Sequence, residues 1–259
     1  MSALAGRRVV VTRARHQAGG IAAALETRGA LPVFFPTITI SPIRDHGQFG
    51  EVMRTLASFS WIVFTSANVV AQFWAAMQRA NIARLPADVK AAAVGSSTAE
   101  ALGAIGITVD AQPETFTGGA IAGTMGVIRD TRVLLPRGDR ARPETARALR
   151  ERGAMLVEVA LYQTTYETPH PSALEQVRAG ADAITFTSPS TVQGFAQIFG
   201  IEARTVLGSA VVAAIGPTTA RAIADAGWGE PIQAISATSQ ALVECLEDHF
   251  AAARAARGA

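Results

Sequence analysis

The chain contains an internal repeat, and this repeat constrains its fold more than any other feature of the sequence. Three blocks return in the same order: "VVVTRARHQAGGIAAALETRGALPVFFP" as "VLLPRGDRARPETARALRERGAMLVEVA", "WIVFTSANVV" as "AITFTSPSTV", and "AAVGSSTAEALGAIGI" as "AAIGPTTARAIADAGW". Gly29 aligns with Gly153 and Gly95 with Gly216, so the spacing between the copies is nearly constant. A repeat of this size predicts two similar structural units.

Each copy has the pattern of strand, turn and helix, repeated. "RVVVT" and "RVLLP" are short continuous apolar runs, typical of parallel strands that are buried on both faces. The helical patterns after them end at "RGA" in both copies, with glycine where a left-handed backbone is needed. We therefore predict an α/β fold of two flavodoxin-like lobes with parallel sheets.

Two segments, 31–43 and 154–167, are longer than the usual strand of ~5–6 residues. Pro36 and Pro42 interrupt the first, so it does not suit one central strand. Because these segments occupy equivalent places, we predict a two-stranded β linker that makes the first lobe discontinuous. The expected division is lobe one at 1–36 plus 167–259, lobe two at 42–160, and hinge strands at 37–41 and 161–166. A simple cut near residue 128 is the alternative.

The composition limits the classes of protein to consider. The 259 residues are 49% hydrophobic and 17% charged, which suits a folded chain with a large core. No run reaches the ~18 apolar residues of a membrane helix, and the N-terminus has the order of a first strand, so we expect a cytoplasmic protein. Cys245 is the only cysteine, and the four histidines lack metal-ligand spacing, so no metal site is expected.

The positive charge comes almost entirely from arginine. A net charge of +2 is too small to favour nucleic acid as a partner. Arginines cluster in "RRVVVTRAR" and "RGDRARPETARALR", which suggests local anion binding, although solvated helix faces would also explain many of them. The expected partner is a small molecule, with neither nucleic acid nor membrane.

Small hydroxyl-rich turns follow five of the predicted strands: "TSAN", "GSST", "TSPS", "GPTT" and "SATS". In an open parallel sheet, ligands bind at the carboxyl ends of the strands, where helix N-termini attract anions. Each turn alone is explained as a helix cap. Five of them facing a gap between two lobes would favour an anion-rich ligand.

Common catalytic and cofactor motifs are missing. Neither G-x-x-x-x-G-K-[ST] nor G-x-G-x-x-G follows a strand, and "GGAIAGTMG" follows a loop. A lysine Schiff base would have to use Lys90, the only lysine, and no nucleophile elbow is present. The sequence therefore predicts a cofactor-free protein that works by binding and orientation.

The blocks "VVVTRAR", "VFTSANVV", "AVGSSTAEAL", "LLPRGDRARPETARALRERGA", "VALYQT", "TFTSPSTVQGF", "AAIGPTTARAI" and "SATSQALVE" together resemble the uroporphyrinogen-III synthase family over nearly the whole chain. The resemblance implies two α/β lobes joined by a two-stranded linker. It also implies a cofactor-free cyclisation of hydroxymethylbilane, a linear tetrapyrrole with eight carboxylates, in which water is lost and ring D is inverted. A monomer that contacts the preceding pathway enzyme transiently is expected.

The resemblance also suggests site residues. Tyr162 in "VALYQT" matches a tyrosine proposed to assist departure of the hydroxyl group, although a strand aromatic would serve packing equally well, and Tyr166 is a weaker candidate. Arg13, Arg137 and Arg142 are expected carboxylate partners, ahead of Arg15 and Arg140. The remaining expected substrate-binding residues are Thr12, Thr65, Ser66, Ala67, Asn68, Ser96, Ser97, Gly138, Ser188, Ser190, Pro217, Thr218, Thr219, Thr238 and Ser239. A non-catalytic two-lobed protein that binds a polycarboxylate is the main alternative, followed by a nucleotide-binding regulator.

Overall fold

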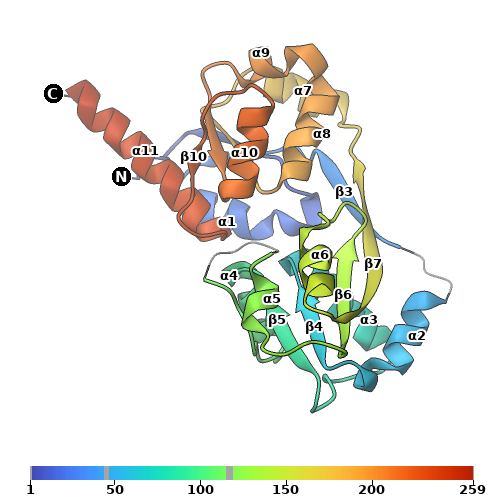
Figure 1. Ribbon diagram of the computed structural model, residues 1–259. Coiled ribbons are helices and arrows are strands. Elements are labelled where there is room, and N and C mark those ends of the chain that lie inside the picture. Colours follow the sequence, from blue (N-terminus) through green and yellow to red (C-terminus); the bar gives the residue numbers. More distant parts are fainter. Residues whose placement is uncertain (1, 44–46, 115–118, 259) are drawn as a thin grey trace. The chain divides into compact units, whose positions relative to one another are not determined.

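The computed structural model describes residues 2–43, 47–114 and 119–258 (Figure 1). The chain forms two compact units. Lobe one comprises Met1–Ile40 and Thr165–Ala259, and lobe two comprises Ser41–Thr164. Lobe one is thus built from the two ends of the chain, and lobe two from one continuous stretch.

Lobe one contains a five-stranded sheet in the order β10-β9-β8-β1-β2, in which every pair is parallel. Its strands are β1 (Arg8–Val11), β2 (Leu31–Phe34), β8 (Ala183–Phe186), β9 (Val211–Ala214) and β10 (Ile232–Gln233). The central strands β1 and β8 are buried on both faces, which explains their uninterrupted apolar sequences.

Helices cover both faces of this sheet. They are α1 (Gly19–Thr27), α7 (Pro171–Arg178), α8 (Pro189–Phe199), α9 (Ala203–Leu207), α10 (Pro217–Asp225) and α11 (Ser239–Gly258). One core cluster joins α1 and α11 to the sheet through Leu25 and Leu246. The other joins α8 and α10 to it, with Phe195 and Phe199 packed against each other at 4.6 Å between ring centroids.

Lobe two repeats this arrangement. Its sheet order is β3-β7-β6-β4-β5, with β3 (Ile38–Pro42), β4 (Trp61–Phe64), β5 (Lys90–Ala93), β6 (Arg132–Gly138) and β7 (Met155–Tyr166). Its helices are α2 (Gln48–Arg54), α3 (Ala67–Arg79), α4 (Ser96–Ala104), α5 (Ile121–Thr124) and α6 (Glu144–Glu151). The sequence repeat matches β1, β2, β8 and β9 with β6, β7, β4 and β5, and these strands have the same order in both sheets. The repeated sequence therefore encodes one repeated scaffold.

The two long segments form β2, β3 and β7. Glu167 donates its backbone N–H to Thr37 O, and Ile43 donates to Leu161 O, so β3 and β7 run antiparallel. The pairs β4–β5, β4–β6 and β6–β7 are parallel. The predicted fold class, α/β with two largely parallel sheets, is confirmed. Among the described residues, no helix combines the length and the apolar character needed to cross a membrane.

Candidate active site

The turn after β4 in lobe two holds residues 65–68. Ser66 is the N-cap of α3, with an extended backbone (φ −162°, ψ 158°), and its Oγ accepts the backbone N–H of Val69 at 3.3 Å. Thr65, Ala67 and Asn68 are half-buried beside it. The turn therefore caps the helix, as its composition predicts.

The turn after β5 works differently. Gly95 is the N-cap of α4 and provides no side chain, and Ser96 and Ser97 are the first two helical residues. Ser96 Oγ is buried and has no hydrogen-bond partner among the described residues. A buried hydroxyl without a partner is unfavourable unless a ligand or water satisfies it. Capping therefore does not account for Ser96.

Tyr162 lies on β7, directly opposite Gly138 on β6. Its phenol takes part in a hydrogen bond with the Ser66 side chain. Burial raises the pKa of Tyr162 above its ordinary value of 10, the hydrogen bond with Ser66 partly offsets this, and the negative charge of Asp139 raises it further. The phenol is therefore fully protonated at neutral pH and can donate a proton.

The arginines of lobe two differ in their partners. Arg137 Nε lies 3.0 Å from Glu158 Oε2, an ion pair without hydrogen-bond geometry, and Glu158 also pairs with Arg150. Arg142 is exposed just before α6, and no carboxylate of the described residues forms an ion pair with it. Arg137 thus already has a carboxylate partner, whereas Arg142 can accept one from a ligand.

In lobe one, Thr12 and Arg13 follow β1 directly. The Thr12 side chain is completely buried and donates to Thr185 O at 2.7 Å, so it holds β1 to β8. Arg13 is half-buried, its Nε lies 3.5 Å from Gln17 Oε1, and no described carboxylate pairs with it. Burial lowers the pKa of Arg13 below the ordinary value of an arginine. The guanidinium remains charged at neutral pH and has no counter-ion within the described ranges, which makes it a good receptor for a carboxylate.

The other turns of lobe one also begin helices. Ser188 and Thr191 form a capping box on α8, where Ser190 is in the first turn. Gly216 is the N-cap of α10, followed by exposed Pro217 and Thr218 and by buried Thr219. Thr238 Oγ1 accepts the N–H of Ala241 at 3.1 Å near the start of α11, which begins at Ser239. Each lobe thus brings its predicted turn residues to the carboxyl edge of its own sheet.

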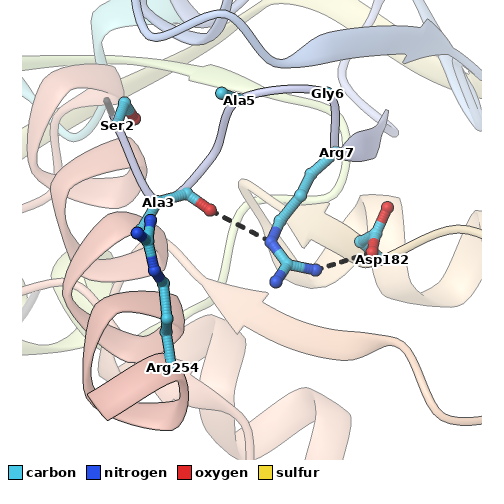
Figure 2. A pocket seen from close by; sticks show the side chains of 7 residues that line it. All are labelled: Ser2, Ala3, Ala5, Gly6, Arg7, Asp182 and Arg254. Atoms are coloured by element: carbon cyan, nitrogen blue, oxygen red, sulfur yellow. Dashed lines mark hydrogen bonds and ion pairs between the residues drawn. The ribbon is translucent and has the colours of Figure 1, made fainter. Parts of the chain in front are cut away.

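A hollow of about 430 Å³ lies at the amino edge of the sheet of lobe one (Figure 2). Its lining residues are Ser2, Ala3, Ala5, Gly6, Arg7, Asp182 and Arg254. Arg7 donates to Ala3 O at 3.1 Å and to Asp182 Oδ1 at 2.7 Å, and its guanidinium stacks on Phe250. This charge is already compensated, and parallel α/β sheets bind ligands at the other edge. The carboxyl edges therefore remain the candidate site.

Sequence reasoning missed two charged residues in this part of lobe two. Asp139 and Glu158 were not expected in the site, yet the charge of the first raises the pKa of the phenol and the second pairs with Arg137. The signal for Asp139 was its place directly after a strand, in "PRGD". Glu158 carried a weaker signal, a lone charge inside an apolar strand pattern.

Comparison with known proteins identifies the family. The family model described as uroporphyrinogen-III synthase HemD matches residues 20–244, most of the chain. The chain belongs to the uroporphyrinogen-III synthase family. A uroporphyrinogen-III synthase of Synechococcus elongatus is 30% identical over 226 residues, which cover 83% of this chain and 85% of that protein. The porphyrin biosynthesis protein HemD of Ruminiclostridium josui is 31% identical over 74% of this chain, which spans only 39% of that longer protein.

Solved structures show the same fold. A uroporphyrinogen-III synthase of Thermus thermophilus matches with a TM-score of 0.67 at 19% identity, covering 96% of this chain and 99% of that one. The enzyme of Helicobacter pylori matches with a TM-score of 0.59 at 16% identity, covering 95% and 99%. The predicted family and function, a cyclising lyase of porphyrin biosynthesis, are confirmed by the family match and the relatives.

Proposed function

We propose that Tyr162 is the general acid with which this uroporphyrinogen-III synthase starts the cyclisation of hydroxymethylbilane. The observation that supports this role is the setting of the phenol, which is half-buried, hydrogen-bonded with Ser66 and held protonated by its raised pKa. A protonated group is what departure of a hydroxyl group requires, because hydroxide is a poor leaving group and water is a good one.

The reaction needs little further chemistry from the protein. As the carbon–oxygen bond breaks, the phenol proton goes to the departing oxygen, water leaves, and the electron pair of the pyrrole nitrogen forms a conjugated azafulvene. The substituted α-carbon of ring D then bonds to this electrophile and gives a spiro intermediate. The bond from that carbon to the bridge of ring C breaks, and the freed bridge carbon bonds to the unsubstituted α-carbon of ring D, which inverts the ring. The pyrrole proton that is lost as aromaticity returns restores the phenol. The net change is loss of one water.

The protein's main task in this proposal is to select the product. Without guidance the azafulvene closes to the symmetric isomer I, so the attacking carbon of ring D has to be held in place. Correct placement of reacting groups can be worth ~7–11 kcal/mol in favourable cases. The proposal assigns this task to the helix N-termini at the carboxyl edges and to Arg13 and Arg142, which bind the carboxylates of the substrate.

Arg137 has a different role in this proposal. Its pairing with Glu158 means that a substrate carboxylate would have to compete with an existing partner 3.0 Å away. Arg137 therefore orders the end of β6. The segments 37–41 and 161–166 are the proposed linker strands, and a cytoplasmic monomer that meets the preceding enzyme transiently completes the proposal.

The direct test is to add the purified protein to hydroxymethylbilane, oxidise the products and separate the uroporphyrin isomers. The proposal predicts isomer III without added metal or nucleotide. Isomer I as the main product, with tight binding of the tetrapyrrole, would instead support a non-catalytic polycarboxylate-binding protein. Tyr162→Phe then tests the assigned acid, because it removes only the hydroxyl group.

A further inference from the structure

The ring of Tyr162 occupies space that only a glycine at position 138 leaves open. A Cβ added to Gly138 would lie 2.7 Å from Cε2 and Cζ of Tyr162 and 2.8 Å from its hydroxyl oxygen. Contacts under 3.0 Å force one of the groups to move. Gly138 does not have a positive φ, so its backbone does not require glycine. The reason for glycine here is the ring of Tyr162.

The strand register brings this pair together. Arg137 lies opposite Ala160, but the next residue, Gly138, lies opposite Tyr162, so Leu161 is an extra residue in β7. An extra residue of this kind is a bulge, which re-aims the side chain that follows it. Leu161 packs into the core of lobe two. Without the shift, Leu161 would stand opposite Gly138.

Asp139 forms hydrogen bonds with the two residues of β7 that flank Gln163, in the part of the strand that follows the bulge. Its backbone N–H donates to Tyr162 O at 3.0 Å, and its carboxylate oxygen Oδ1 accepts the N–H of Thr164 at 2.9 Å. In a parallel ladder, the second bond would go to a main-chain carbonyl. The side chain of Asp139 thus extends the ladder beyond the last residue of β6.

We infer that Gly138 and Asp139 are positioning residues for Tyr162: Gly138 leaves room for the ring, and Asp139 holds the bulged strand that carries it. This inference rests on the proposed function, in which Tyr162 is the acid. The first repeat supports it independently. There, Ala14 and Arg15 take the places of Gly138 and Asp139, and β2 ends at Phe34, before any equivalent of Tyr162.

A stability cycle tests the contact without using activity. Gly138→Ala should lower Tm by roughly 3–10 °C when Tyr162 is present, because the new methyl group displaces the ring. In a Tyr162→Ala background, the same substitution should change Tm by less than about 2 °C. Gly103→Ala in α4 is the control for a methyl group without a clash, since a Cβ there meets nothing within 4 Å, and it should leave Tm unchanged or raise it, because alanine favours a helix. Equal losses in both backgrounds would overturn the inference.

The outcome remains readable if Gly138→Ala fails to fold. Recovery of a folded protein in the double variant Gly138→Ala/Tyr162→Ala would support the contact. A double variant that also fails to fold would overturn it.

Titration of the phenol gives a second readout. The chain has two tyrosines, so Tyr166→Phe leaves Tyr162 as the only phenol seen by ultraviolet absorbance. The groups that act on it are Ser66 and Asp139, while Arg137 and Glu158 pair with each other. Gly138→Ala should move the titration midpoint down toward the ordinary value as the ring becomes solvated. An unchanged midpoint would contradict a displaced ring.

Two variants of Asp139 separate its charge from its hydrogen bond. Asp139→Asn keeps an acceptor for Thr164 and should lower the phenol midpoint with less than a threefold loss of kcat. Asp139→Ala removes the acceptor as well and should lower kcat at least tenfold with little change of KM. Equal kcat for the two variants would exclude the fastening role.

Double variants distinguish failure of the inference from failure of the proposed function. Gly138→Ala should lower kcat in the Tyr162 protein and cause no further loss when combined with Tyr162→Phe. If Tyr162→Phe is fully active while the stability cycle and the titration hold, the acid role is wrong and the contact stands. If neither the Tm values nor the phenol titration shows coupling between position 138 and Tyr162, the positioning role of Gly138 is wrong, whether or not Tyr162 is the acid.

Discussion

The two lobes have the same strand order, yet they differ at the end of the first repeated strand. In lobe one this strand continues into Thr12, Arg13 and Ala14, and the hydroxyl of Thr12 is used within the sheet. In lobe two the matching residues are Pro136, Arg137 and Gly138, and the last of these faces Tyr162. Both copies have the same scaffold, and they differ at the place where lobe two carries the phenol of Tyr162.

The matched arginines show a second difference. Arg137 finds Glu158 on the neighbouring strand, whereas the residue equivalent to Glu158 next to Arg13 is Phe34. One guanidinium therefore has a carboxylate partner inside the protein, and the other has none among the described residues. In the proposed function, lobe two supplies the proton through Tyr162, and lobe one supplies Arg13 as a partner for a substrate carboxylate.

The largest effect is expected on kcat when Tyr162 is changed, with Tyr166 as the comparison. Tyr162→Phe should lower kcat ~10²–10⁴-fold, the usual contribution of a general acid. Tyr166→Phe, in the part of β7 that belongs to lobe one, should change kcat less than about twofold, since the proposed mechanism gives its hydroxyl, which bonds Gln193 at 3.4 Å, no proton to transfer. Steady-state rates of isomer III formation decide this, and equal losses would remove the distinction between the lobes.

The pH dependence of kcat tests whether Tyr162 acts as the acid. A general acid works only while protonated, so kcat should fall as the pH rises through the raised pKa of Tyr162. Asp139→Asn removes a charge that raises this pKa, so the alkaline fall should move to lower pH. A kcat profile measured on both proteins tests the sign, and a shift to higher pH would contradict it.

The two arginines should respond in different quantities. Arg13→Gln should raise KM roughly 10–100-fold, the effect of losing one charge-assisted hydrogen bond of ~1.5–3 kcal/mol. Arg137→Gln should instead lower Tm, because Glu158 loses one of its two partners. Kinetics and thermal unfolding of both variants provide the check, and a larger rise of KM for Arg137→Gln would reverse the assignment.

Ser66 and Ser188 each accept a backbone N–H at 3.3 Å at the start of a helix and should give similar losses of stability. Replacing either with alanine should cost ~0.5–2 kcal/mol in the free energy of unfolding. Only Ser66→Ala should also move the alkaline fall of kcat, to higher pH, because its hydrogen bond lowers the pKa of Tyr162. Ser188→Ala serves as the control, and a similar shift there would separate Ser66 from the phenol.

The smallest effect concerns Arg28 and Arg152, which the repeat also matches. Ser2 and, to a smaller extent, Arg28 donate hydrogen bonds to the Glu247 carboxylate and lower its pKa below the ordinary 4.5. Arg152 instead donates to a backbone carbonyl, Gly126 O. A lowered carboxyl pKa gives stability that is present above the ordinary value and lost as the pH falls through the folded value. Glu247→Gln should therefore lower Tm by at most about 3 °C at neutral pH and by nothing in strong acid, since the pair is partly exposed.

The fold was largely predictable because its signals are local. Continuous apolar runs gave β1 and β6, "RGA" gave the ends of two helices, and the excess length of 31–43 and 154–167 gave β3 and the long β7. The repeat then required the two sheets to be alike. These inferences need only neighbouring residues and the period of a strand or helix.

The site was less predictable because it depends on pairing between strands. Nothing in "VALYQT" shows that Leu161 is a bulge residue in the pairing of β7 with β6. The position of Tyr162 opposite Gly138 could therefore not be predicted. Thr12 has the composition of a binding residue, yet its hydroxyl points into the sheet. Glu158 and Arg137 meet only because β6 and β7 are in register, a property of the fold.

The order in which the chain is made gives the discontinuous lobe a further consequence. β1 and β2 emerge from the ribosome early and can pair, but the second neighbour of β1, β8, begins only at Ala183. At ~5–20 residues per second, β1 waits roughly 10–30 s for it. Residues 41–164 can meanwhile fold around their own core. If synthesis stopped after residue 164, lobe two would be folded, whereas the apolar strand β1 would still lack β8 and remain exposed on that side.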